Sequence, residues 1–257
     1  MQRRRVIIVT GANNGIGLGL AQALAAGGDQ VACFDLSGEN LAGLTYIRCD
    51  VTDPVQVGAS IAQVLSQWGR VDILVNNACL AIFAPFEEKP LSDTRREFEV
   101  NYFGYVNMIH GVLPAMKAQR GGVIHNFSST VGTSGFAGIY GYSSTKGAID
   151  ALSRTLAIEF APYGITVNIV HPPLTRTKSS SPLGVPAQFM ADPAEVGRKL
   201  AKKIGSKGAV VTPGIAESLG VLSSKLAPEA MGKFLSARAA AAREAAVSKS
   251  HDGTRNT

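Results

Sequence analysis

VTGANNGIGLGL, residues Val9–Leu20, is the stretch that decides the fold class of this chain. Its glycines Gly11, Gly15 and Gly17 follow directly after the apolar run Val6–Val9, which predicts a strand. Glycine weakens strands and helices, so three glycines at the junction of a strand and a helix need a reason. Bare backbone there allows a tight turn and lets a pyrophosphate approach the N–H groups of the helix N-terminus. The stretch therefore predicts a dinucleotide-binding turn, with a glycine-rich turn that binds nothing as the alternative.

Apolar, β-branched runs alternate with longer segments of helical period along the rest of the chain. This alternation is typical of right-handed βαβ units. We therefore expect residues 1–257 to form a single α/β domain, a doubly wound parallel β-sheet of the Rossmann type with helices on both faces. The expected strands are Arg5–Thr10, Gln30–Asp35, Thr45–Cys49, Val71–Asn76, Gly122–Phe127, Ile165–His171 and Gly208–Thr212. The expected helices are Gly15–Ala26, Pro54–Gln67, Asp93–Gln119, Tyr142–Ala161 and Pro193–Ile204.

Two segments depart from this alternation. Residues 174–191 contain the run Ser179–Pro182 and are expected to form a substrate lid that orders on binding. Residues 236–257 are expected to begin as a helix in SARAAAAREAAVSKS and to fray in HDGTRNT.

Composition narrows the class of protein. Hydrophobic residues make up 46% of the chain and charged residues 17%, which favours an ordered globular core. No apolar stretch approaches the roughly 20 residues that span a bilayer, so no membrane partner is expected. The formal net charge of +6 is spread along the chain without interleaved aromatics, so nucleic acid is not expected either. Cys33, Cys49 and Cys79 have neither disulfide-framework nor metal-site spacing, which favours a reducing cytoplasm and no metal.

Asp35 strengthens the interpretation of the glycine turn. It ends the second expected strand, 18 positions after Gly17, close to the offset of about 20 residues at which an acid binds an adenosine ribose. A carboxylate there would repel a 2′-phosphate, and neither Asn13 nor Asn14 is basic, so NAD is favoured over NADP. An ordinary acid at the end of a strand is the alternative.

Further motifs stand at intervals along the chain. They are Thr10 before the Gly-x-x-x-Gly-x-Gly turn, Asp50-Val51, NNAC at Asn76–Cys79, Asn101 in VNYFG, NFSS at Asn126–Ser129 and YSSTK at Tyr142–Lys146. Together they resemble the classical short-chain dehydrogenase/reductase family, and the resemblance covers roughly Val6 to Thr177.

The resemblance implies an NAD-dependent enzyme that interconverts a small-molecule alcohol and ketone. The implied catalytic residues are Ser129, Tyr142, Lys146 and Asn101. The implied cofactor-binding residues are Gly11, Asn14, Gly15, Ile16, Gly17, Asp35, Asp50, Val51, Asn77, Ala78, Tyr142, Lys146, Pro172 and Thr177. It also implies a homodimer or homotetramer, paired through Asp93–Gln119 and Tyr142–Ala161, and a water relay supported by Asn101.

The chemistry of Tyr142 and Lys146 agrees with this assignment. They stand one helical turn apart and share a face. A phenol with a pKa near 10 is a poor base at neutral pH, and a neighbouring ammonium is expected to lower that pKa. Ser129 would hold the substrate oxygen, with Ser128 as its competitor. A surface Tyr–Lys pair, and a buried asparagine at Asn101 that only bonds backbone, are the alternatives.

Three features depart from the family pattern. Cys79 and Pro173 stand where the family has glycine, and the C-terminal region lacks the Asp-Gly-Gly-like motif. The expected substrate walls, Ala81–Leu91, Thr130–Ile139 and Leu174–Phe189, are largely apolar and favour a hydrophobic substrate. His171 is a conceivable substrate contact. A serine hydrolase lacks its nucleophile elbow here, whereas a nucleotide-sensing protein without catalysis stays open.

Overall fold

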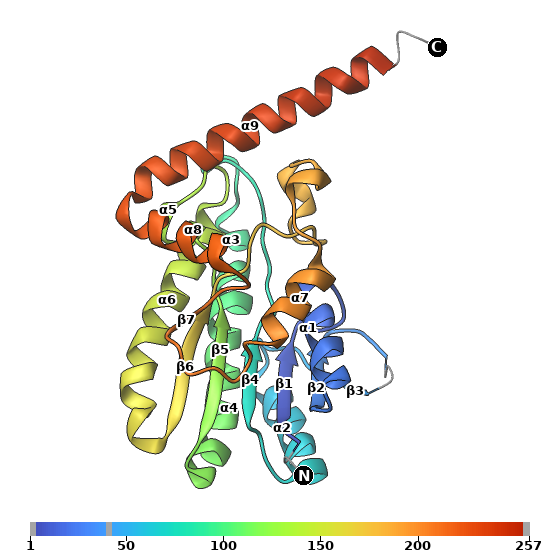
Figure 1. The fold of residues 1–257 in the computed structure, drawn as a ribbon, viewed down its shortest axis with the longest axis vertical. Helices are drawn as coiled ribbons and strands as arrows, with labels where there is room; N and C mark the ends of the chain where they lie inside the picture. Colours follow the sequence, from blue (N-terminus) through green and yellow to red (C-terminus); the bar gives the residue numbers. More distant parts are fainter. Residues whose placement is uncertain (1–3, 40–42, 254–257) are drawn as a thin grey trace.

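The computed structural model describes residues 4–39 and 43–253, with side chains described to residue 241 (Figure 1). Among these residues lies a seven-stranded sheet with the order β3-β2-β1-β4-β5-β6-β7, and all its paired strands are parallel. The expectation of a doubly wound parallel sheet is confirmed. The strands are β1 Val6–Thr10, β2 Gln30–Asp35, β3 Leu44–Arg48, β4 Ile73–Asn76, β5 Gly122–Phe127, β6 Ile165–Val170 and β7 Val210–Val211.

Helices cover both faces of the sheet. The described helices are α1 Gly15–Ala26, α2 Pro54–Trp68, α3 Leu91–Phe98, α4 Gly104–Gln119, α5 Val131–Ser134, α6 Tyr140–Phe160, α7 Pro193–Ala201, α8 Ile215–Leu226 and α9 Pro228–Gly253. One hydrophobic core joins α1 and α7 to the sheet, through Leu20, Val196 and Ile7 among others. The other core joins α2, α4 and α6 to the opposite face. The carboxyl edge of the sheet is thus framed by helices on both sides.

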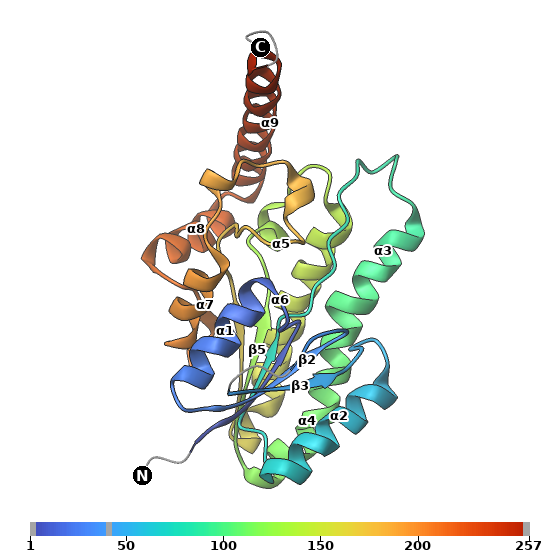
Figure 2. The same cartoon turned by 90° about the vertical axis from the view of Figure 1, so that its right-hand side faces the viewer.

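The structure differs from the expected elements in several places. The single helix expected over Asp93–Gln119 is divided into α3, a π-helical turn at Glu99–Phe103 and α4. Strand β7 has only two residues, and α8 was not expected from the sequence. The C-terminal helix begins at Pro228, and both views show it projecting beyond the carboxyl ends of the strands (Figures 1 and 2). Residues 254–257 of the expected frayed end lie outside the described residues.

The glycine turn between β1 and α1 has the backbone that its sequence predicts. Gly11 and Gly15 have φ angles of 64° and 59°, in the region that side chains rarely adopt. A Cβ on Gly11 would lie 2.8 Å from the Cα of Ala78, so β1 and the segment after β4 approach too closely for any side chain there. At Gly17, a Cβ would collide with the carbonyl oxygen of Gly11. These contacts explain why glycines stand at the start of α1.

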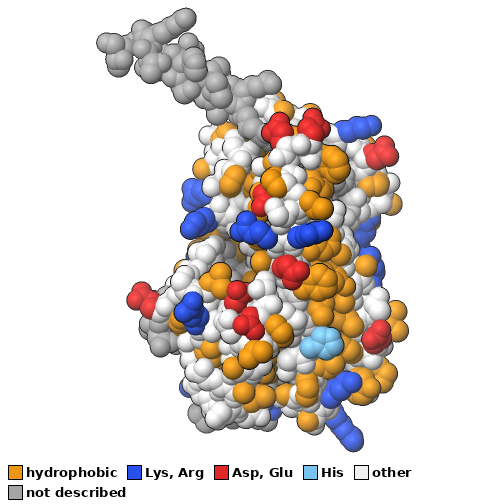
Figure 3. Space-filling view, turned by 180° about the vertical axis from the view of Figure 1, so that it is seen from behind, with side chains coloured by type: hydrophobic (Ala, Val, Ile, Leu, Met, Phe, Trp, Pro, Cys, Tyr) orange, Lys and Arg blue, Asp and Glu red, His pale blue; other side chains and the backbone are white. Residues whose placement is uncertain are grey.

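Charged side chains show no strong segregation on the face opposite to that of Figure 1. Acidic and basic side chains are interspersed there among hydrophobic ones (Figure 3). None of the helices in the described part of the chain is long and apolar enough to cross a membrane.

His125 ties the middle of the sheet to the segment after α7. It lies fully buried in β5, and its Nε2 atom accepts a hydrogen bond of 2.9 Å from the N–H of Gly205. Burial lowers the pKa of His125 to about 4. The imidazole is therefore neutral in the folded protein at neutral pH.

We predict that His125 makes the fold sensitive to acid. Because its folded pKa lies below the unfolded value of about 6.5, the unfolded chain binds the extra proton and stability falls as the pH drops through this window. Between neutral pH and about pH 4.5, this residue should lower the free energy of unfolding by about 2 to 3 kcal/mol. Urea unfolding at both pH values measures the loss. His125→Gln should show a smaller loss than the wild type, whereas the exposed control His110→Gln should show the same loss. Equal losses in both variants would contradict the prediction.

Candidate active site

A cavity of about 1430 Å³ lies at the carboxyl edge of the sheet. It is lined by residues at the ends of β1, β2, β4, β5 and β6. Every residue predicted to bind the cofactor lines this cavity except Gly17, and every predicted catalytic residue lines it except Asn101. Parallel sheets bind their ligands at this edge. The cavity is therefore the candidate active site.

The β1 end of the cavity fits the diphosphate of a dinucleotide. Asn14 precedes α1 without capping it through its side chain, and the first turn of the helix holds no acidic residue. The amide groups at this helix end are thus left for an anion. Gly15 faces Thr177, whose Cγ2 would lie 3.2 Å from a Cβ at that position. The residues present fit a nicotinamide dinucleotide.

Two acids lie along the adjoining wall. The carboxylate of Asp35, at the end of β2, accepts hydrogen bonds from the N–H groups of Asn13 at 3.0 Å and Leu36 at 2.8 Å. Asp50 accepts from the N–H and the hydroxyl of Thr52, at 2.9 and 2.7 Å. These bonds fix both carboxylates against the backbone, and both line the cavity.

Hydrogen bonds of Thr10 and Asn77 join the end of β1 to the end of β4. The hydroxyl oxygen of Thr10 accepts from the N–H groups of Asn77 and Ala78, each at 3.0 Å. The amide of Asn77 donates in return to the carbonyls of Thr10 and Gly11, each at 3.0 Å. The glycine turn is thereby held in place beside the segment that begins Asn76-Asn77-Ala78.

Tyr142 and Lys146 lie one turn apart on α6 and both line the cavity. Lys146 is buried, and its Nζ donates to the carbonyl of Phe127 at 2.8 Å. The same Nζ lies 5.5 Å from the ring centroid of Tyr142 and 5.4 Å from that of Tyr105. The arrangement differs from a surface Tyr–Lys pair, because both side chains face an enclosed site.

The two candidate serines after β5 have different surroundings. The hydroxyl of Ser128 is buried and donates to the carbonyl of Lys146 at 3.2 Å. Ser129 lies against Tyr142, and its hydrogen bond lowers the pKa of that phenol. The geometry favours Ser129 over Ser128 as the serine that works with Tyr142.

The pKa of Tyr142 departs from the sequence-based expectation. Burial raises it well above the ordinary value of a phenol, and the negative charge of Cys79, once ionised, would add to the rise. The expectation of a lowered pKa is wrong for the site as it stands, because desolvation outweighs the hydrogen bond from Ser129 that lowers it. At neutral pH the phenol therefore carries its proton.

Asn101 stands in the π-helical turn Glu99–Phe103 and does not line the cavity. It is fully buried; its Oδ1 accepts from the N–H of Leu80 at 2.7 Å, and its Nδ2 donates to the carbonyl of Leu80 at 2.8 Å. The same Nδ2 lies 3.1 Å from the hydroxyl of Thr145, which donates to the carbonyl of Tyr142 at 2.7 Å. Asn101 thus joins the segment after β4 to the turn of α6 that carries Tyr142 and Lys146.

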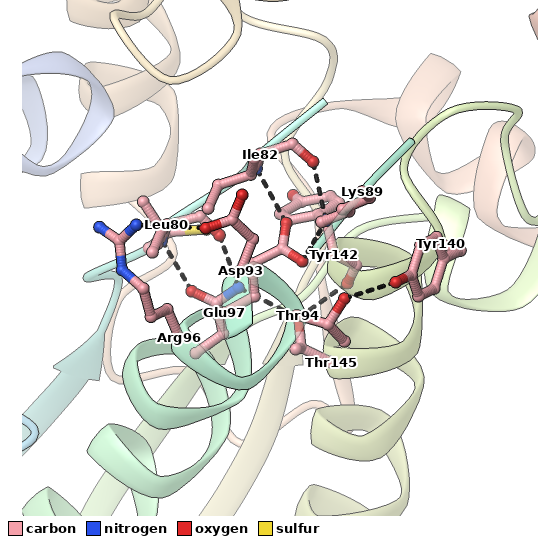
Figure 4. A network of polar contacts seen from close by, with 12 residues as sticks. Leu80, Ile82, Lys89, Asp93, Thr94, Arg96, Glu97, Tyr140, Tyr142 and Thr145 are labelled. Carbon is pink, nitrogen blue, oxygen red and sulfur yellow. Dashed lines mark hydrogen bonds and ion pairs between the residues drawn. The ribbon is translucent and has the colours of Figure 1, made fainter. Parts of the chain in front are cut away.

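A buried ion pair that the sequence analysis missed lies next to Tyr142 (Figure 4). The side chains of Lys89 and Glu97 are completely buried, with Nζ and Oε2 2.5 Å apart. Lys89 also donates to the carbonyl of Ile82 at 2.9 Å, and Glu97 accepts from the N–H of Ile82 at 2.8 Å. The pair clamps the segment between β4 and α3 onto α3. A charged residue inside an expected helix gave no signal of this, because its partner lies in a loop.

His171 and Cys79 also line the cavity. Burial is the main cause of the lowered pKa of His171 and of the raised pKa of Cys79. Cys79 therefore carries a protonated thiol, which narrows the site without offering a thiolate. Pro173, the other departure at a family glycine, also lines the cavity.

The far wall of the cavity agrees with the expected substrate segments only in part. Phe83, Phe136, Leu183 and Phe189 line it, whereas Phe86 is 75% exposed and stacks on Tyr140 outside it. Additional wall residues come from α8, which was not expected, and from α9, of which only the part from residue 236 was expected to be helical and none was assigned to the cavity. They are Ala216, Glu217, Gly220, Val221, Phe234, Leu235, Arg238, Ala239 and Ala241. The part of the chain that the structure describes holds no His/Cys/Asp/Glu group that could bind a metal.

Comparison with known proteins agrees with this geometry. The family model described as short chain dehydrogenase matches residues 5–185. The chain is 35% identical to L-fucose dehydrogenase of Oryctolagus cuniculus over 65% of this chain and 62% of that protein. It is 35% identical to 3-ketodihydrosphingosine reductase of Bacteroides thetaiotaomicron over 65% of this chain and 63% of that protein. The chain thus spans just under two thirds of the length of these two relatives.

Solved structures share the fold. A short-chain dehydrogenase from Streptomyces avermitilis has a TM-score of 0.74 and 30% identity, with 88% of this chain and 93% of that chain covered. A gluconate 5-dehydrogenase from Burkholderia cenocepacia, solved with NADP and tartrate, has a TM-score of 0.74 and 27% identity, covering 82% and 94%. A 3-ketoacyl-(acyl-carrier-protein) reductase from Brucella melitensis, solved with NADH, has a TM-score of 0.72 and 26% identity, covering 81% and 94%.

Proposed function

Because the chain belongs to the classical short-chain dehydrogenase/reductase family, whose members are oxidoreductases that use nicotinamide cofactors, we propose that it is an NAD-dependent enzyme that interconverts a secondary alcohol and a ketone. The observation that carries the proposal is one shared cavity. It holds the glycine turn at one end and brings Ser129, Tyr142 and Lys146 together on its wall. The apolar far wall supports a hydrophobic substrate.

In this proposal the residues of the chain manage the proton. A bound nicotinamide supplies the carbon that gives or takes the hydride. Tyr142 donates its phenolic proton to the ketone oxygen during reduction and accepts a proton from the alcohol during oxidation. Ser129 donates a hydrogen bond to the same oxygen and stabilises the developing alkoxide charge. Lys146 keeps its ammonium beside the ring and so stabilises the phenolate that forms as the proton leaves.

Asn101 is a positioning residue in this proposal. Its amide holds Leu80 and reaches Thr145, which in turn bonds the backbone of Tyr142. The turn of α6 that carries the reacting groups is therefore fixed against the loop after β4. A water relay from Lys146 through Asn101 remains part of the proposal rather than a feature of the described contacts.

The two directions of the reaction should depend on pH in different ways. Because burial raises the pKa of Tyr142, the phenol is protonated and ready to act as an acid at neutral pH. We expect kcat/KM for ketone reduction to stay level through neutral pH and to fall only in the alkaline range, while alcohol oxidation rises with pH. Initial rates in both directions over a pH series measure this. A reduction rate that halves near neutral pH would show that the phenol titrates there, against the prediction.

Asp35 supports NAD rather than NADP as the cofactor. Replacing it with asparagine removes the negative charge while keeping the size of the side chain. We expect kcat/KM for NAD to fall by about tenfold, since hydrogen bonds to charged groups contribute about 1.5 to 3 kcal/mol, and the value for NADP to rise. Asp93→Asn, on α3 away from the cavity, is the matched control and should leave the ratio unchanged. An unaltered NAD to NADP ratio in the Asp35 variant would remove this basis for the preference.

The direct test of the proposed function has two measurements. Calorimetric titration with NADH and NADPH tests cofactor binding, and a panel of ketones and secondary alcohols, followed through the absorbance of the reduced cofactor, tests turnover. Binding together with turnover of at least one apolar ketone supports the proposal. Binding of NADH without turnover on the whole panel would favour a nucleotide-sensing protein instead, and no binding of either coenzyme would overturn both.

The proposal also covers the cellular compartment and the oligomeric state of the enzyme. Cys33, Cys49 and Cys79 are free thiols, which supports a reducing cytoplasm. Exposed apolar side chains on and beside the helices expected to pair, Phe103 at 47% and Ile158 at 77%, support a homodimer or homotetramer.

A further inference from the structure

The cavity is larger than a single ligand requires. Its volume of about 1430 Å³ exceeds the roughly 300 to 1,000 Å³ of ordinary ligand pockets. The glycine turn, Asp35 and Asp50 line one part of it. The remaining part is lined by the segment 174–189 and by helices α8 and α9, and the helices lie beyond residue 185, where the family match ends. We call this remaining part the outer chamber.

The outer chamber is apolar along α8 and α9 apart from two charged side chains, whereas the segment 174–189 contributes apolar residues together with Thr175, Thr177, Ser179, Ser180 and Gln188. Helix α8 contributes Val221, which is 7% exposed, and α9 contributes Ala239, which is 6% exposed. Phe234 and Leu235 of α9 extend the same wall towards the outside. The segment 174–189 faces them with Leu174, Leu183, Val185, Pro186 and Phe189. Such a lining favours a hydrocarbon chain that leads away from Tyr142.

Two charged side chains from these helices also line the chamber, Glu217 and Arg238. Glu217 stands in the first turn of α8, where the helix N-terminus stabilises a carboxylate. Lys199 pairs with Glu195, whose hydrogen bond is the main cause of the raised pKa of Lys199, and the charge of Glu217 adds a smaller share to that rise. Arg238 makes no ion pair with any residue that the structure describes. Its guanidinium lies 5.6 Å from the ring centroid of Phe234, so the aromatic wall of the chamber holds it in place.

We propose that α8 and α9 form a recognition site for the far end of the substrate, and that this substrate is an elongated apolar ketone or secondary alcohol ending in a carboxylate, which Arg238 binds. The inference rests on the proposed function, because it takes the reacting carbon to lie at Tyr142. The apolar chain fills the chamber and excludes water, while Arg238, exposed at the rim, pairs with the acid in a partly solvated position.

The test uses straight-chain methyl ketones that end in a carboxylate, in a series of increasing length that starts with levulinate, each paired with its methyl ester. In the wild type, KM should fall as the chain lengthens, and beyond the length that reaches Arg238 the acid should be favoured over its ester. Arg238→Gln should raise KM for the long acid by about fivefold, as for a partly exposed ion pair, and leave KM for its ester and kcat unchanged. Arg238→Lys should keep part of the preference.

Two further variants separate recognition from structure. Lys233→Gln removes an exposed cation of α9, and Lys233 lies outside the cavity. This variant should change neither the KM for the long acid nor the KM for its ester. Leu235→Trp fills the chamber, so the fall in KM with increasing chain length should be lost in this variant. Calorimetry with the long acid, in the presence of NAD, gives an affinity that does not depend on turnover.

The outcomes distinguish failure of the recognition site from failure of the proposed oxidoreductase function. Weaker binding of the long acid to Arg238→Gln, with its ester unaffected, supports the recognition site even if the series shows no turnover, and the wider panel of ketones and alcohols then decides the oxidoreductase proposal separately. Turnover in which the wild type treats acid and ester alike at every length would overturn the inference and leave the oxidoreductase proposal standing. Equal binding of the acid by the wild type and Arg238→Gln would also overturn it.

Discussion

Replacing Tyr142 with phenylalanine should lower kcat for both directions of the reaction by about three orders of magnitude, within the range of general acid–base catalysis. The variant keeps the ring and loses only the hydroxyl, which in the proposed function passes the proton to and from the substrate oxygen. Since α1 and the glycine turn are untouched, the affinity for NADH should stay within about twofold of the wild type. Steady-state kinetics and calorimetric titration measure the two quantities.

Tyr140 provides the matched control for this variant. It stands on the same helix, and its hydroxyl bonds the hydroxyl of Thr94 at 2.7 Å rather than facing the cavity. Tyr140→Phe should therefore retain nearly all turnover. Comparable rates for Tyr142→Phe and the wild type would overturn the assignment of Tyr142, whereas a loss of NADH affinity in Tyr142→Phe would point to damage in the cofactor half of the site.

Breaking the buried pair of Lys89 and Glu97 should be strongly destabilising. Lys89→Met leaves the carboxylate of Glu97 buried without its cation, and Glu97→Leu leaves the ammonium of Lys89 in the same position. Each should lower the free energy of unfolding by about 3 to 5 kcal/mol. The double variant removes both charges, and apolar replacements of buried pairs are often neutral, so it should recover to within about 2 kcal/mol of the wild type. Urea unfolding at neutral pH measures all three.

An exposed ion pair supplies the control for this comparison. Glu195 and Lys199 stand on α7 at 2.7 Å, with about half of each side chain exposed. Lys199→Met should cost far less than Lys89→Met, because exposed ion pairs contribute little to stability. If Lys89→Met cost no more than Lys199→Met, or if the double variant were as unstable as the sum of the single ones, the account of the buried pair would be wrong.

The sequence predicts the parts of the site whose chemistry is local. Gly11 and Gly15 indicate positive φ angles because few other residues adopt them, and the structure has both. Tyr142 and Lys146 share a face because they are one helical turn apart. Asp35 lies at the cavity because it ends a strand of a parallel sheet, and the carboxyl ends of such strands meet at one edge.

Features that depend on tertiary packing were missed or misjudged. The direction of the pKa shift of Tyr142 depends on how deeply α6 is buried, which the spacing to Lys146 does not reveal. Lys89 and Glu97 meet only because the segment after β4 folds back over α3. The π-helical turn around Asn101 divides one expected helix, and the side-chain bonds of Asn101 to Leu80 depend on how the segment after β4 packs against this turn. The part that α8 and α9 play in the cavity depends on how they return over the sheet edge.

The position of α8 and α9 along the chain makes the outer wall exchangeable. Both helices follow the last strand, so no strand pairing and no part of the glycine turn depends on their sequence. A chimera that joins residues 4–211 to the corresponding helices of another member would keep the residues proposed to move protons and acquire a different outer wall. Natural variation after β7 is therefore the place where new specificities can arise without rebuilding the enzyme.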